Sequence, residues 1–316
     1  MKITKHLISL LTLVSIHHVT HTQAPEMVRS HREFLNFLPT TGNKLTPPIS
    51  RSLPINLLQT RLPENPAQQK RAIIVGASNG MGREVAKLLA ADGYIVGLAA
   101  RRLSRLQEIQ KTIPTQSYIK QLDASKPEEA IKNFEALIQD MGGLDLLVIS
   151  ITGFYEVDYK NRDWKADKAV FDVDILGFYA LARTGLNYFE KQGHGHLVGF
   201  SSVDGLRGIA GCPSYSAAKA FCSRYMEAER NRFMQKNLPV IVTDIIPGWI
   251  NNNDDPDYQK NHPKAYWIDS LKDASQEIFQ AIKNKDSVAY ITKRWQKVAD
   301  LIKVIPDDLY NALGGL

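Results

Sequence analysis

The sequence Tyr215-Ser216-Ala217-Ala218-Lys219 places a phenol and an ammonium group four positions apart. On a helix, side chains at this spacing share one face, with their Cβ atoms about 6 Å apart. A positive charge at that range favours the phenolate and lowers the pKa of the phenol from its usual value of about 10. Tyr215 could then give or take a proton near neutral pH. The alternative is that both residues are ordinary neighbours on a solvated helix face.

A glycine-rich turn, Gly76-Ala77-Ser78-Asn79-Gly80-Met81-Gly82, joins a short apolar strand at 72–76 to a helix at about 80–92. Its glycines allow a tight turn, and the free N–H groups that begin the helix favour a phosphate. We therefore predict a dinucleotide site that uses Gly76, Ser78, Asn79, Gly80, Met81 and Gly82.

The charge at the end of the second strand indicates which dinucleotide binds. This strand ends Ala99-Ala100-Arg101-Arg102, with arginines where NAD-selective folds place an acid. A guanidinium matches the 2′-phosphate of NADP, so Arg101 and Arg102 favour NADP(H) over NAD(H). The alternative is that both arginines are solvent-facing residues at the start of a helix and have no part in cofactor binding. Asp123 follows the third strand, either to accept from the adenine amino group or to cap a turn.

Strands and helices alternate from residue 71 to residue 292. This alternation predicts a single α/β domain of the doubly wound, Rossmann type, with a mainly parallel sheet of about seven strands. Ligands of such sheets bind beyond the carboxyl ends of the strands. Strands are expected at 72–76, 94–100, 117–122, 144–150, 196–202, 239–246 and 288–292, and helices at 80–92, 103–111, 127–141, 164–192 and 213–236.

Together these motifs resemble the short-chain dehydrogenase/reductase family. The features that carry the resemblance are Gly76–Gly82, Asp123, Ser202, the Tyr215–Lys219 pair and Pro247-Gly248. The resemblance implies hydride transfer between a nicotinamide and a carbonyl or alcohol carbon. It implies that Tyr215 is the general acid/base, that Lys219 assists it and holds the nicotinamide ribose, and that Ser202 bonds the substrate oxygen. It also places Pro247, Gly248 and Ile250 at the cofactor.

Three positions depart from the family pattern. Asp174 stands where the family has an asparagine that completes a proton relay, and we retain it as a catalytic candidate. The segment Ile149-Ser150-Ile151-Thr152-Gly153 replaces the usual Asn-Asn-Ala-Gly, which places bulk near the cofactor. Asn252 replaces a threonine that touches the nicotinamide amide.

The expected function is therefore an NADP(H)-dependent oxidoreductase acting on a hydrophobic small-molecule ketone, aldehyde or secondary alcohol, with the chain expected to form a homo-oligomer. The first two departures keep open an NADP-binding protein with weak or no catalysis. A net charge of +6 without a long Lys/Arg run does not indicate nucleic-acid binding. Histidines between positions 6 and 21 lack Cys or acidic partners at ligand spacing, so no metal site is predicted.

The ends of the chain have their own patterns. Residues 1–24 are either a secretory signal peptide or an apolar N-terminal segment, and residues 25–70 form a Pro-rich linker or arm. A nicotinamide cofactor favours the cytoplasm, although the signal-like segment leaves export open. A substrate lid is expected at about 251–270. Residues 293–316 predict an amphipathic helix that either docks on the domain or contacts a membrane peripherally.

Overall fold

The computed structural model describes residues 69–153, 163–252 and 265–312, and all of them belong to one compact unit. The predicted signal-like segment, nearly all of the predicted linker and the middle of the predicted lid lie outside the described residues.

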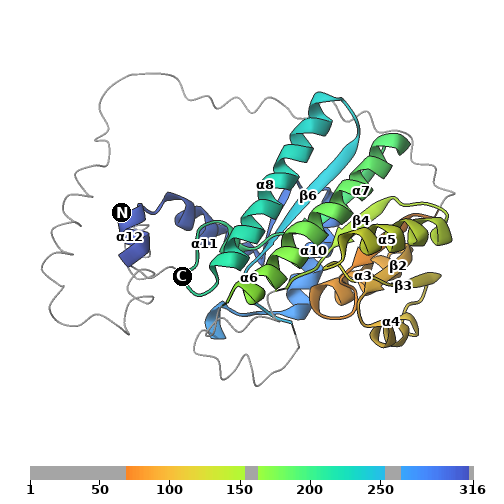
Figure 1. Cartoon of the computed structure of the whole chain (residues 1–316), viewed down its shortest axis with the longest axis horizontal. Coiled ribbons are helices and arrows are strands. Elements are labelled where there is room, and N and C mark those ends of the chain that lie inside the picture. The colour runs from red at the N-terminus through yellow and green to blue at the C-terminus, as the bar shows by residue number, and fades with distance from the viewer. Residues whose placement is uncertain (1–68, 154–162, 253–264, 313–316) are drawn as a thin grey trace, which may run out of the picture. The chain divides into compact units, whose positions relative to one another are not determined.

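Within the described residues, seven strands form one sheet in the order β3-β2-β1-β4-β5-β6-β9, and every neighbouring pair is parallel (Figure 1). This arrangement confirms the predicted fold. The strands are β1 (Arg71–Val75), β2 (Ile95–Ala100), β3 (Ser117–Gln121), β4 (Leu146–Ile149), β5 (Gly195–Phe200), β6 (Val240–Pro247) and β9 (Val288–Ile291). A short parallel pair, β7 (Ile250–Asn251) and β8 (Asp269–Ser270), lies apart from this sheet.

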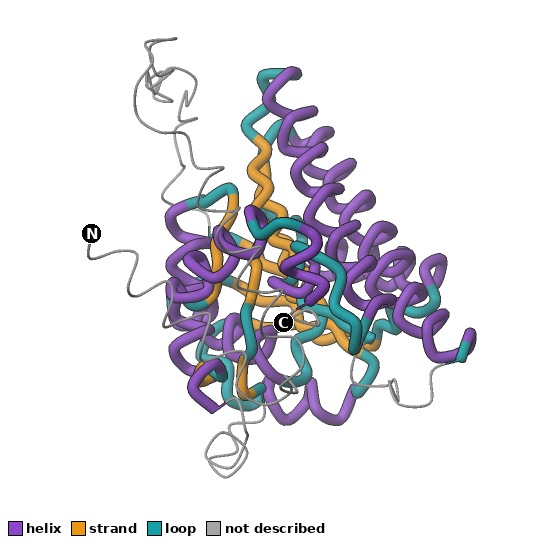
Figure 2. Tube along the Cα trace, turned by 90° about the vertical axis from the view of Figure 1, so that its left-hand side faces the viewer, coloured by secondary structure: helices purple, strands orange, loops and turns teal. Residues whose placement is uncertain are grey.

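Helices cover both faces of the sheet, and Figure 2 shows the strands between them. The side chains of β1 alternate between the two faces: Ile73 and Val75 join one apolar cluster, whereas Ala72 and Ile74 join the other. The first cluster contains α5 (Pro127–Met141), α7 (Phe178–Gln192) and α8 (Pro213–Gln235). The second contains α3 (Gly80–Ala91), α4 (Leu103–Gln110) and α10 (Leu271–Asn284).

The structure corrects two expectations about helices. The single helix predicted at 164–192 is interrupted: α6 (Trp164–Phe171) leads into a π-helical segment, η3 (Asp172–Gly177), before α7 begins. Helix α10 has no counterpart among the predicted helices. Its signal is a capping Ser270 followed by buried Leu271, Ala274 and Ile278 at helical spacing.

The C-terminal segment forms two helices instead of the predicted one. Helix α11 (Lys293–Val304) ends before Pro306, which cannot continue it, and α12 (Asp307–Ala312) follows. Trp295, Ala299 and Ile302 on α11 are buried. The membrane alternative is not supported, because this apolar face already packs within the domain. Among the described residues, no helix combines the length and hydropathy needed to cross a membrane.

An arginine ties these C-terminal helices to the loop after β5. Arg207 Nη1 donates to the carbonyl oxygen of Ile305 at 2.6 Å, and Nη2 lies 2.6 Å from Asp307 Oδ1. The guanidinium carbon sits 4.0 Å from the centre of the Tyr310 ring, and the Tyr310 hydroxyl donates to the carbonyl oxygen of Gly208 at 3.0 Å. The loop and the C-terminus therefore hold each other in place.

Removing this arginine should loosen the C-terminus. The Asp307 side chain is 89% exposed, so its ion pair contributes less than about 1 kcal/mol, whereas the half-buried bond to Ile305 should contribute about 1.5–3 kcal/mol. We expect Arg207→Ala to lower the free energy of unfolding by the larger amount and to speed proteolysis of 293–312, measured by denaturation and mass spectrometry. Asp307→Asn is the control; equal losses in both variants would contradict this assignment.

A buried histidine makes stability depend on pH. His196 Nε2 lies 2.8 Å from Thr243 Oγ1, and Thr243 uses its hydroxyl proton on the carbonyl oxygen of Asp286 at 2.5 Å. The histidine must therefore carry a proton on Nε2 and donate it to Thr243. Burial, assisted by the charge of Lys285, lowers the pKa of His196 from 6.5 to about 3.

Because the unfolded chain binds this proton and the folded chain does not, stability should fall as the pH falls. His196 has a pKa of 6.5 in the unfolded chain and about 3 in the folded one. Between these values, each unit by which the pH falls should lower the free energy of unfolding by up to about 1.4 kcal/mol through this residue. Urea denaturation of the parent and His196→Gln across this range measures that slope. His194→Gln, at an exposed site two residues away, is the control. If the free energy of unfolding falls as steeply with pH in His196→Gln as in the parent, the assignment is wrong.

Candidate functional site

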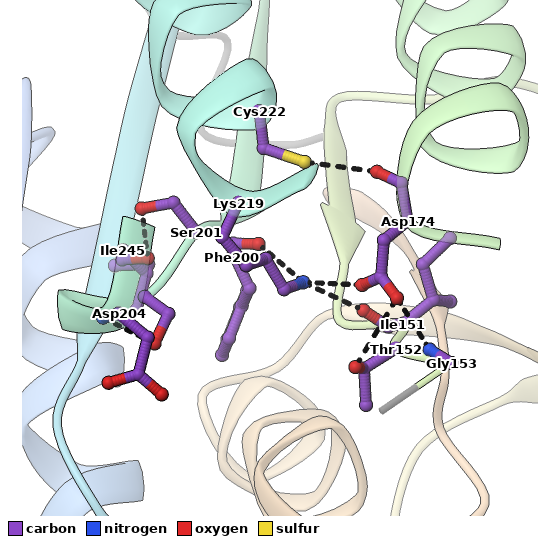
Figure 3. Close-up of polar contacts among 11 residues, drawn as sticks. Ile151, Thr152, Gly153, Asp174, Phe200, Ser201, Asp204, Lys219, Cys222 and Ile245 are labelled. Atoms are coloured by element: carbon purple, nitrogen blue, oxygen red, sulfur yellow. Dashed lines mark hydrogen bonds and ion pairs between the residues drawn. The ribbon is translucent and has the colours of Figure 1, made fainter. Parts of the chain in front are cut away.

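The candidate active site lies where β4 and β5 end. Lys219, in the second turn of α8, donates from Nζ to the carbonyl oxygens of Phe200, the last residue of β5, and of Ile151, just after β4, each at 3.2 Å (Figure 3). Carboxyl ends of parallel strands meet at one edge of a sheet, so one side chain can reach both. The structure thus places Lys219 at the edge where ligands of this fold bind.

Lys219 forms a buried ion pair with Asp174. Nζ lies 2.8 Å from Asp174 Oδ1, and the two side chains are 3% and 0% exposed. Burial of the ammonium lowers the pKa of Lys219, but the adjacent Asp174 carboxylate outweighs this, and the net pKa is raised above 10.5. Lys219 therefore stays charged at any physiological pH.

Tyr215 and Ser202 both precede this lysine in the chain. Lys219 Nζ is 5.6 Å from the centre of the Tyr215 ring, so the predicted phenol–ammonium pair is adjacent in space. Ser202 precedes η4 (Val203–Gly205), and its Oγ accepts from the backbone N–H of Asp204 at 3.1 Å. A Cβ on Gly205 would lie 2.7 Å from the carbonyl carbon of Lys219, so η4 packs directly against α8.

Asp174 reaches the lysine from the π-helical segment. Such segments interrupt helices at functional sites, because the extra residue redirects side chains. Asp174 Oδ2 accepts from the backbone N–H of Gly153 at 2.6 Å and lies 3.5 Å from Thr152 Oγ1. The backbone carbonyl of Asp174 accepts from Cys222 Sγ at 3.2 Å, and burial raises the pKa of Cys222 to about 12, so the thiol keeps its proton.

A second buried carboxylate supports the site, and the motifs above do not reveal it. Asp244 on β6 accepts from Ser201 Oγ at 2.6 Å and from Ser223 Oγ at 2.7 Å. Ser201 is next to Ser202, and Ser223 lies one helical turn beyond Lys219. Burial raises the pKa of Asp244 above its usual value, despite these hydrogen bonds. Its sequence signal is weak: one acid beside Thr243 within a mostly apolar strand.

The glycine-rich turn has the geometry that a dinucleotide phosphate needs. Gly76 has a φ of +93°, and a Cβ there would lie 2.0 Å from the carbonyl oxygen of Ser150. A Cβ on Gly82 would lie 2.5 Å from the Gly76 oxygen, so α3 begins directly against the end of β1. Asn79 precedes α3 without capping it through its side chain, and the first turn contains no acid. The start of α3 therefore remains favourable to an anion.

A basic cavity of about 330 Å³ opens beside this turn. Arg102 is in its wall, and Arg102 Nη2 donates to Ser78 Oγ at 3.1 Å. Arg101 is not among the lining residues, which are Ser78, Asn79, Arg83, Arg102, Arg105, Glu108 and Ile109. Arg83 and Arg105 are absent from the predicted set. Two sequence features could have identified them: Arg83 directly follows Gly82, and Arg105 lies three residues after Arg102, which is a helical spacing.

Other predicted cofactor residues lie at the same strand ends. Asp123 Oδ1 accepts from the backbone N–H and the hydroxyl of Ser125 at 3.0 and 2.8 Å, the turn role considered above. Pro247 ends β6, Ile250 begins β7, and the N–H of Gly248 donates to the carbonyl oxygen of Ile291 at 2.6 Å. A Cβ on Gly80 would lie 3.1 Å from Asn252 Oδ1, so Asn252 adjoins the glycine turn.

The aromatic residues in and next to the predicted lid separate into two groups. Trp249 and Trp267 pack on Trp295, with ring centres 5.6 and 5.7 Å from it, and this cluster adjoins Val203 and Leu206 next to η4. Tyr266, in contrast, is 75% exposed, and Tyr258 lies outside the described residues.

Comparison with known proteins agrees with this geometry. The short chain dehydrogenase family matches residues 70–262. An uncharacterized oxidoreductase of Myxococcus xanthus is 31% identical over 248 residues, which cover 77% of this chain and 95% of that relative.

Two solved structures share the fold. A short-chain dehydrogenase from Streptomyces avermitilis has a TM-score of 0.65 at 20% identity, covering 78% of this chain and 96% of its own. A short chain dehydrogenase from Burkholderia cenocepacia, in complex with NADP, has a TM-score of 0.62 at 21% identity, covering 71% of this chain and 96% of its own. From the family match over residues 70–262 and the Myxococcus relative, this chain belongs to the short chain dehydrogenase family and is an oxidoreductase of that type.

Proposed function

We propose that this protein is an NADP(H)-dependent oxidoreductase that interconverts a carbonyl compound and its alcohol, with Tyr215 as the general acid/base. The observation that carries the proposal is the position of the Lys219 ammonium, 5.6 Å from the centre of the Tyr215 ring at the carboxyl edge of the sheet. A phenol beside a fixed cation is suited to proton transfer at a carbonyl oxygen.

The residues present fit a phosphorylated dinucleotide. The N-terminus of α3 and the turn at Gly76 would hold the pyrophosphate, and Arg83, Arg102 and Arg105 around the basic cavity would hold the 2′-phosphate. Glu108 lies on the same wall, but it pairs with Arg105 at 3.1 Å, which leaves an excess of positive charge there. This excess favours NADP(H) over NAD(H).

In this mechanism the protein orients the substrate oxygen and moves one proton. A nicotinamide held at this site would supply the hydride, one hydrogen with two electrons, that the carbonyl carbon accepts. Tyr215 gives its proton to the carbonyl oxygen, so that the products are the alcohol, the oxidised nicotinamide and a phenolate that regains a proton from water. In the proposed mechanism the Ser202 hydroxyl would hold the same oxygen, and the Lys219 ammonium would lie beside the Tyr215 ring.

The substrate is expected to be a small molecule with an apolar body. The tryptophan cluster around Trp295 lies next to η4, directly after Ser202, and provides an apolar surface there. The homo-oligomer implied by the family resemblance remains a prediction.

Replacing Tyr215 should separate catalysis from cofactor binding. We expect Tyr215→Phe to lower kcat for carbonyl reduction by about 10²–10⁴-fold, because the general acid is lost, while the Kd for NADPH stays unchanged. A panel of aldehydes and ketones with NADPH, followed at the nicotinamide absorbance, measures this. Tyr179→Phe, on the exposed face of α7, is the matched control. NADPH binding without turnover in the parent would instead favour the binding-protein alternative.

The basic cavity should discriminate between the two cofactors. Each charged bond to the 2′-phosphate should contribute about 1.5–3 kcal/mol, so Arg102→Ala and Arg105→Ala should each weaken NADPH binding about 10- to 150-fold. NADH binding should change little, because NADH lacks that phosphate. Titration calorimetry gives both constants, with the exposed Arg224→Ala as the control. Equal losses for the two cofactors would contradict a 2′-phosphate site.

A further inference from the structure

The two oxygens of the Asp174 carboxylate contact different groups: one forms an ion pair and the other accepts a hydrogen bond. Oδ1 faces the Lys219 ammonium at 2.8 Å, whereas Oδ2 accepts from the backbone N–H of Gly153 at 2.6 Å, with Thr152 Oγ1 at 3.5 Å (Figure 3). All of this is enclosed, since Asp174 is completely buried and Lys219 nearly so.

An asparagine could not make both contacts. Its side chain has one acceptor oxygen and one NH₂ donor, so it would turn a donor either toward Lys219 or toward the N–H of Gly153. Two of the departures from the family pattern, the acid at 174 and the altered segment at 151–153, therefore belong to one arrangement. A carboxylate suits this position because the N–H of Gly153 and the Lys219 ammonium each approach one of its two oxygens.

This arrangement occupies the lysine and balances its charge. Nζ donates to the carbonyl oxygens of Ile151 and Phe200 at 3.2 Å, and Asp174 Oδ1 lies 2.8 Å from it as its ion-pair partner. A unit negative charge so close to the cation cancels most of its field at the Tyr215 ring, 5.6 Å from Nζ.

The other ionisable groups that the structure describes around the lysine do not restore that field. Cys222, on α8, keeps its proton because burial raises its pKa to about 12. Asp244, on β6, accepts from Ser201 and Ser223, and when ionised it adds negative charge. Asp204 is a further acid; it belongs to η4, which packs against α8 at Lys219.

Building on the function proposed above, we propose that Asp174 is a positioning residue that holds and neutralises Lys219, so that Tyr215 keeps its proton at neutral pH and the site works as a carbonyl reductase. In that direction a protonated phenol is required, since it gives its proton to the carbonyl oxygen as hydride reaches the carbon. The reverse reaction requires the phenolate, which is scarce until alkaline pH.

The titration of Tyr215 itself tests this without any turnover. In full-length protein labelled with ¹³Cζ-tyrosine, NMR signals are followed from pH 6 to pH 11.5, and Tyr215→Phe assigns the Tyr215 signal. In the parent, Tyr215 should titrate at or above the ordinary midpoint of about 10. In Asp174→Asn, the uncancelled ammonium should lower the midpoint by about one pH unit or more.

The matched control is Asp172→Asn, which removes an acid from the same π-helical segment. Asp172 pairs with Lys168 at 2.5 Å instead of Lys219, so its loss should leave the Tyr215 midpoint unchanged. In kinetics, kcat/KM for alcohol oxidation should rise with pH up to the Tyr215 midpoint, and this rise should end at lower pH in Asp174→Asn.

The parent protein decides the question even if Asp174→Asn does not fold, as thermal unfolding would reveal. A parent midpoint near 7 would overturn the proposal, as would a folded Asp174→Asn that titrates like the parent. A high midpoint in the parent together with a Tyr215→Phe variant that turns over normally would have a different meaning. It would support the charge balance and refute the proton-donor role in the proposed function.

Discussion

The contact between Lys219 and Asp174 holds the candidate site together. It joins four parts that are distant in sequence: α8, the π-helical segment η3, the end of β5 and the segment that follows β4. Removing one partner of a buried ion pair leaves an unpaired charge and costs about 3–5 kcal/mol. The residues around this pair are therefore constrained by stability as well as by chemistry, and Tyr215 takes its electrostatic surroundings from the pair.

In the proposed function, the two halves of the domain have different roles. The first half, from β1 to α4, has the glycine turn and the arginine-lined cavity suited to the phosphates of a dinucleotide. The second half, from β5 to β6, contains Ser202, Tyr215 and Lys219, supported by Asp244 through hydroxyl groups on both sides. The C-terminal helices contact Arg207, in the loop after Ser202, through Ile305 and Tyr310. They therefore help to hold the loop that follows the candidate site.

The fold could be predicted from the sequence because buried parallel strands and amphipathic helices leave clear periodic patterns, and all seven strands were expected near their observed positions. The Tyr215–Lys219 proximity followed from helical spacing alone. The contacts of Asp174 with Lys219 and Gly153 could not be predicted in detail, because they depend on a π-helical segment that breaks the usual helical spacing. The contacts of Asp244 and Arg207 could not be predicted either, because their partners are far away in the sequence.

The charge state of Lys219 is the most direct test of this account. In protein labelled with ¹³Cε-lysine, the Lys219 signal is identified by its loss in Lys219→Arg and is followed up to pH 11.5. Because Asp174 raises the pKa of Lys219 above 10.5, the account predicts that this signal shows no midpoint at or below that value. A midpoint clearly below 10.5, as burial without a paired carboxylate would produce, would contradict it.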